Sequence, residues 1–118
     1  MIVFNKYKNV TKISIPNNMR LSTNNFRNSF EYMLNLKSVE FNHPDVVDIS
    51  RTYYYCNNLS IMPICGIGVI NMSNAYTGCT NLIGSPVCGN NVINMYVAYN
   101  NCVNLTGSPV CGPNVIDM

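Results

Sequence analysis

The sequence predicts an α/β repeat solenoid of the leucine-rich-repeat type, with 23-residue coils, a parallel β-sheet on one face and short helical or turn segments behind it. The first observation is the period of 23 residues, seen in two cysteine registers, Cys56, Cys79 and Cys102, and Cys65, Cys88 and Cys111. The second is that residues without sulfur keep the same register, since the run from Tyr76 to Met95 recurs from Tyr99 to Met118. A fixed period of roughly 20 to 50 residues is typical of repeat architectures.

The register divides the chain into two parts. Residues 1–29 are predicted to form a divergent N-terminal cap, where Tyr7, Val10 and Ile13 keep the apolar frame but the signature residues are missing. Terminal repeats are usually atypical because they cover the exposed end of a stacked core. The solenoid is predicted over residues 30–118, with coils at 30–52, 53–75, 76–98 and 99–118.

Within each coil, a leucine-rich pattern predicts a short strand. The pattern is carried by Leu36, Val39 and Phe41 in one coil and by Leu59, Met62 and Ile64 in the next. Stacked coils would join these strands into a parallel sheet. The segment that follows has apolar residues at helical spacing, as in Val92, Met95, Tyr99 and Cys102, which predicts a short helix or helical turn behind the sheet.

A polar ladder marks the start of that return segment. It consists of Asn25, Asp48, Asn71, Asn94 and Asp117. Short polar side chains of this kind bond the free amides of a turn or a helix start. A calcium ladder is the functional alternative, but two Asp among five residues are few for it, so we expect turn residues and no metal site.

The two cysteine registers lead to different expectations. We expect free thiols, because adjacent rungs point their β-carbons the same way. Cys56, Cys79 and Cys102 fit the helical apolar frame and are expected to be buried. The cysteines of the second register and the prolines two residues before them are predicted to form outward stripes on the sheet face. The alternative is a strand shifted by one residue, which would bury the prolines and the cysteines. The candidate binding residues are therefore Pro63, Cys65, Gly84, Pro86, Cys88, Gly107, Pro109 and Cys111.

Catalytic, cofactor and metal motifs are not found in the sequence. His43 is the only histidine and lies in the turn-like Asn42-His43-Pro44. The sequence has no G-x-S-x-G, no C-x-x-C and no phosphate-cradling glycine spacing. We therefore expect a protein that is not an enzyme and that holds no cofactor.

Charge is concentrated in the first half of the chain, with Asp117 as the one charged residue after Arg51. Every Lys and Arg lies at or before Arg51, and residues 52–116 carry no Asp, Glu, Lys or Arg. Seven basic residues against five acidic ones cannot form a strong phosphate-binding patch, so nucleic acid is not an expected partner. No stretch has the length of a membrane span or the pattern of a secretory signal, so we expect no membrane insertion and see no signal peptide in this chain.

The run from Asn91 to Leu105, with copies that start at Val46 and Val69, resembles the BspA-like leucine-rich repeats of bacterial surface proteins, whose unit reads roughly N-V-x-x-M-x-x-M-F-x-x-C-x-x-L. The similarity covers residues 30–118. Two departures are Ala-Tyr in place of Met-Phe and Gly-Ser-Pro-Val-Cys-Gly in place of the variable strand. The resemblance implies a non-catalytic surface or adhesion module, and such repeats also occur in phage and mobile-element proteins.

Two functions follow as hypotheses. The first is a binding or adhesion module displayed on a bacterial cell surface or virion, which engages a protein or glycan of a host or envelope surface through its sheet face. The alternative is an assembly subunit of an oligomer, filament or virion component. It rests on the C-terminal coil, which stops three residues short of a full period without a polar closing segment, so that self-association through this end is expected.

Overall fold

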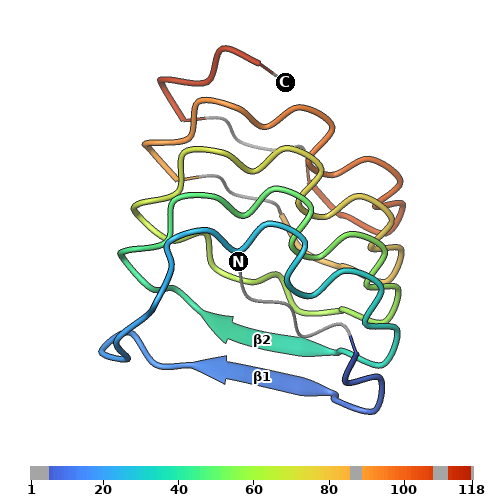
Figure 1. Cartoon of the computed structure of the whole chain (residues 1–118). Helices are drawn as coiled ribbons and strands as arrows, with labels where there is room; N and C mark the ends of the chain where they lie inside the picture. The colour runs from blue at the N-terminus through green and yellow to red at the C-terminus, as the bar shows by residue number, and fades with distance from the viewer. Residues whose placement is uncertain (1–5, 86–88, 108–111, 118) are drawn as a thin grey trace.

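Successive turns of the chain lie on top of one another, with β1 and β2 at one end of the stack and the C-terminus at the other (Figure 1). The structure is a computed structural model, and it describes residues 6–85, 89–107 and 112–117. The stack measures 36 × 32 × 18 Å. Two strands are assigned in the described ranges, β1 (Lys12–Ile15) and β2 (Ser38–Phe41), and no helix is found there.

The two strands pair in parallel, with Lys12 opposite Ser38 and Ile15 opposite Phe41. Their alternating side chains decide which face is inward, since successive residues of a strand point to opposite sides. Val39 and Phe41 are buried, and Ile13 packs against the same core. The sheet therefore covers the core with apolar residues and leaves Lys12 and Glu40 in solvent.

The predicted sheet does not continue as regular strands beyond β2 in the described residues. The next coil contributes a single parallel bridge, Ile61 to Ile83, and a hydrogen bond from the Ser60 amide to the Lys37 carbonyl at 3.2 Å. Pro63 explains part of this interruption, because proline has no N–H to donate to a strand ladder. Parallel strands thus form where the sequence lacks proline, and looser contacts follow.

Behind the sheet, the return segments consist of turns. Parallel bridges join Asn25, Asp48, Asn71, Asn94 and Asp117 in one column. Backbone amides donate to carbonyls 22 residues later, as from Ile49 to Asn71 at 2.9 Å and from Met72 to Asn94 at 2.8 Å. The apolar residues at helical spacing do face the core, but successive three-residue turns produce this spacing. The short helix that the prediction allowed does not occur in the described part of the chain.

The polar ladder forms turns, as predicted for its side chains. Asp48 Oδ1 accepts the Ser50 amide at 2.8 Å, Asn71 Oδ1 accepts the Ser73 amide at 3.0 Å and Asn94 Oδ1 accepts the Tyr96 amide at 2.9 Å. The same bond, from the Arg27 amide to Asn25 Oδ1, occurs in the predicted cap. The hydrogen-bonded columns therefore begin before residue 30, where the prediction placed the start of the solenoid.

A column of aromatic rings occupies the core. Tyr53 stacks on Tyr76, and Tyr76 on Tyr99, each with ring centroids 5.1 Å apart, and Phe30 lies 5.7 Å from Tyr53. Burial raises the pKa of the Tyr53 and Tyr76 hydroxyls. Each coil thus adds one ring to a continuous stack, which explains why an aromatic residue recurs at this position.

The buried cysteines are held by hydrogen bonds as well as by packing. Cys56, Cys79 and Cys102 are free thiols, and their sulfurs donate to the carbonyls of Phe30, Tyr53 and Tyr76 at 3.0, 3.1 and 3.0 Å. Burial raises the pKa of Cys56 to about 12 and that of Cys102 to about 11. Cysteine therefore recurs because the position needs a small side chain that can donate a hydrogen bond.

Candidate binding surfaces

The prolines and cysteines predicted to point outward from the sheet face do not do so in the first coil where the structure describes both of them, the coil with Pro63 and Cys65. Pro63 is buried, so the prediction of an exposed proline was wrong, and Cys65 is half-buried and packs against the core. The outward positions belong to Ile61 and Ile64 instead. The shifted strand, the alternative that the sequence left open, agrees with the burial of Pro63, because an apolar ring without an N–H gains from leaving water.

The two glycines of the predicted surface differ from each other. Gly84 has φ +101°, and a β-carbon at this position would meet no atom within 4 Å. A β-carbon on Gly107 would lie 2.5 Å from Ser85 Oγ, so Gly107 is required where two coils approach closely. The remaining predicted residues, Pro86, Cys88, Pro109 and Cys111, lie outside the described residues.

A groove lies across the sheet end of the stack, and we call it the sheet-face groove. Its volume is about 460 Å³. The lining includes Ser14 and Ile15 from β1, Val39, Glu40 and Phe41 from β2, and Ile61, Met62 and Ile64 from the next coil. Ile61 and Ile64 are 62% and 68% exposed, so two large aliphatic side chains stand in water beside the groove.

The charge on this surface is balanced. The Lys12 ammonium lies 2.9 Å from a Glu40 carboxylate oxygen, and the Ser14 hydroxyl donates to the other oxygen at 3.3 Å. The hydrogen bond and charge of Lys12 hold the pKa of Glu40 below its usual value. The groove is therefore apolar on the Ile61 side and bordered by one neutralised ion pair.

A second surface feature, which we call the tyrosine cluster, consists of Tyr32, Tyr54 and Tyr55. Tyr32 and Tyr55 stack with an interplanar angle of 3° and centroids 5.7 Å apart, and Tyr54 meets Tyr55 edge-on at 4.6 Å. The Arg51 guanidinium lies 3.9 Å from the centre of the Tyr54 ring and 3.8 Å from a Glu31 oxygen.

Sequence reasoning missed the tyrosine cluster. The signal was available, because the positions of Tyr54 and Tyr55 carry Thr77 and Gly78 one period later. A comparison of non-consensus residues between coils would have found it.

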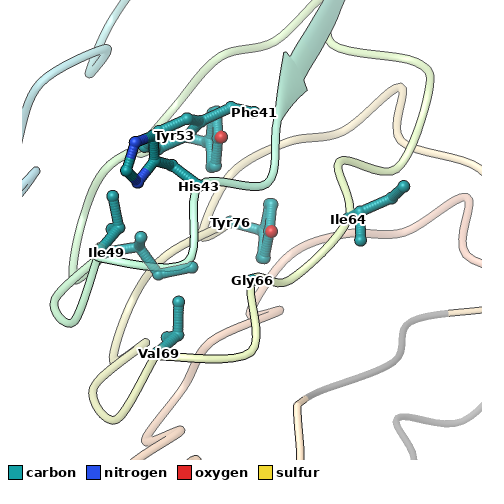
Figure 2. Close-up of a pocket in the computed structure, with 9 residues that line it drawn as sticks. Phe41, His43, Ile49, Tyr53, Ile64, Gly66, Val69 and Tyr76 are labelled. Carbon is teal, nitrogen blue, oxygen red and sulfur yellow. The ribbon is translucent and has the colours of Figure 1, made fainter. Parts of the chain in front are cut away.

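His43 lies inside the fold, in the wall of a small cavity of about 10 Å³ that Phe41, Tyr53 and Tyr76 also line (Figure 2). Its Nε2 donates to the Met19 carbonyl at 2.7 Å, and its Nδ1 accepts the Asp45 amide at 3.1 Å. Both ring nitrogens thus join backbone segments, and this pattern requires the neutral imidazole. The histidine is a structural residue, in agreement with its turn-like sequence context.

No protein-family model, no curated protein and no solved structure matches this chain. The resemblance to BspA-like repeats accordingly stays a prediction that rests on the sequence motif. In the described residues, no helix is long and apolar enough to cross a membrane, and no three His, Cys, Asp or Glu residues gather as a metal site.

Proposed function

We propose that this chain is a non-catalytic binding module whose sheet-face groove receives an extended apolar segment of a partner protein. The observation that carries the proposal is the exposure of Ile61 and Ile64 beside a groove of about 460 Å³. Apolar side chains that gather on a surface commonly mark an interaction site.

The groove fits a protein segment for physical reasons. Burial of apolar surface contributes about 25 cal/mol per Å², so covering two isoleucines would supply a substantial part of the binding free energy. Glu40 is already paired with Lys12, so a partner needs no charge of its own at this place. An extended segment with alternating apolar side chains would place one of them against each isoleucine.

The reactive groups favour binding over catalysis. Burial keeps the Cys56 and Cys79 thiols protonated by raising their pKa, and a thiol is a weak nucleophile compared with a thiolate. His43 uses both ring nitrogens in backbone contacts, which leaves neither for a substrate.

The resemblance to surface repeats supports the same function. Display on a cell surface or virion, and stacking through the C-terminal coil, stay predictions.

A displayed library of random linear peptides tests the proposal, with the whole chain as the target. Peptides retained by the protein should lose at least tenfold in affinity when Ile61 and Ile64 are both replaced by serine. The matched control is Ile67→Ser, because Ile67 is 71% exposed but does not line the groove. Equal loss in the control, or unchanged affinity in the double variant, would refute the assignment of this groove.

Gly107, one of the predicted binding residues, is unsuitable as a substitution site for testing whether the predicted surface binds a partner. A side chain there would push against Ser85 and disturb the stacking of coils, so loss of binding would not report on the surface. Gly84 has open space around it and is a better place for an added charge, although its positive φ disfavours other residues.

A further inference from the structure

The return segments contain two columns of residues in the left-handed backbone region. One column holds Asn28, Arg51, Asn74 and Val97, and the other holds Tyr32, Tyr55, Gly78 and Asn101. Residues other than glycine, asparagine and aspartate rarely adopt a positive φ. In the second column, Gly78 and Asn101 are therefore suited to the backbone, whereas the two tyrosines are strained.

The backbone of this column is the same whatever the side chain. The amides of Tyr32, Tyr55 and Gly78 donate to carbonyls 22 residues later at 2.8, 2.8 and 2.9 Å. Stacking of the coils consequently needs no aromatic ring here, because Gly78 completes the same bond without one. The chain holds two bulky residues at positions where its own repeat accepts glycine or asparagine.

Residues with a strained backbone persist where the surrounding structure holds them, and they cluster at binding sites. The two tyrosines lie in adjacent coils, so their rings stack, and Tyr54 closes one side. Tyr32 remains 45% exposed. Strain and exposure together indicate that this cluster is maintained for contact with another molecule.

Polar groups surround the rings and define the chemistry of that molecule. The Asn28 amide donates to Glu31 at 2.5 Å, and Glu31 in turn lies beside Arg51. An aliphatic partner would take the Glu31–Arg51 ion pair out of water without offering hydrogen bonds in return. Removal of charged groups from water without such bonds costs free energy. A ligand that combines an apolar face with hydroxyl groups would satisfy both the rings and the charged pair.

We propose that the tyrosine cluster is a carbohydrate-binding site, in which a pyranose ring lies against the exposed face of Tyr32 and its hydroxyls bond the groups of Glu31 and Arg51. This site is separate from the sheet-face groove, and its residues do not line it. Its success or failure therefore does not depend on the function proposed for the groove.

The test uses two substitutions that the repeat itself supplies, Tyr32→Asn and Tyr55→Gly, which copy Asn101 and Gly78. The probe is a panel of immobilised gluco-, galacto-, manno- and N-acetylhexosamine oligosaccharides, followed by NMR titration of the saccharide that binds the whole chain. We expect at least a tenfold loss of saccharide affinity in the double variant, with an unchanged circular dichroism spectrum and only a small change in thermal midpoint.

The matched control is Tyr96→Ser, since Tyr96 is 53% exposed, lies outside the cluster and occupies the column of Ser50 and Ser73. It should bind saccharide like the unaltered protein. The proposal is overturned if no saccharide of the panel binds, if the double variant binds equally well, or if Tyr96→Ser loses as much. Loss of peptide binding alone in the double variant would identify a protein-binding surface instead and would also overturn it.

Discussion

Two columns of stacked tyrosine rings in this molecule differ in length, burial and backbone conformation. The inner column, Tyr53, Tyr76 and Tyr99, adds one ring per coil, stacked at 5.1 Å, and Tyr53 and Tyr76 are buried. The outer column, Tyr32 and Tyr55, stops after two coils, is partly exposed and has a positive φ. The inner rings are required for packing, whereas the outer ones are tolerated by the fold.

The difference separates residues that recurring packing contacts explain from residues that such contacts do not explain. A residue that recurs in every coil is explained by contacts that recur, such as the thiol bond of Cys79 to the Tyr53 carbonyl. A residue that departs from its column, at a cost of about 1–3 kcal/mol for a strained backbone, requires another explanation. The four predictions that follow test this separation.

The largest effect should come from alkaline pH, which acts on several inner groups at once. Burial raises the pKa of Cys56 from 9.0 to about 12, so the folded state favours the neutral thiol. Its contribution to stability is complete below pH 9 and is lost between pH 9 and 12, where the unfolded chain ionises first. Urea unfolding from pH 7 to 11 measures this loss, and a flat profile would contradict the buried, protonated column.

Tyr76→Ala should have the next largest effect. It removes a fully buried ring between two stacked neighbours, and such truncations cost about 3–5 kcal/mol. Chemical denaturation measures the change. Tyr96→Ala serves as the control, because truncation of an exposed side chain should change stability by no more than about 0.5 kcal/mol. Similar losses at both positions would remove the distinction between core and surface rings.

Gly78→Ala should be destabilising by about 2–4 kcal/mol. Gly78 has φ +79°, and an added β-carbon would lie 2.5 Å from the Tyr55 ring. The loss of stability that comes from the clash with the Tyr55 ring should disappear in a Tyr55→Gly background. Only the cost of placing alanine at a positive φ should then be left. A double-mutant cycle measures the coupling between the two positions, and strict additivity would show that the ring and the glycine do not meet.

The smallest effect is expected for Tyr55→Gly alone. Relief of the positive φ stabilises the chain, while loss of ring contacts with Tyr32 and Tyr54 and the added freedom of the unfolded chain oppose it. We expect a net change within about 1 kcal/mol, measured by urea unfolding. A loss above about 3 kcal/mol would place Tyr55 among the packing residues, with Tyr76.

The sequence predicted the features that depend on recurrence. The register of 23 residues appears in the bridges from Asn25 to Asp117, and the burial of Cys56, Cys79 and Cys102 follows from their place in the apolar frame. The sequence did not predict which residues of the strand segment face the core and which face water, because Met62, Pro63 and Ile64 are all apolar. The tyrosine cluster requires backbone dihedral angles that a consensus pattern does not contain. Whether the whole is a leucine-rich-repeat solenoid stays a proposal that these columns support.

The bonds between return segments also have a mechanical consequence. They run from one coil to the next, as from Arg51 to Ser73 and from Asn74 to Tyr96, so a force along the stack loads the few bonds of one junction at a time. Coils should then peel away singly, and each would release 23 residues, or about 75 Å of extended chain. A molecule anchored at one end and pulled at the other would lengthen in steps rather than detach at once.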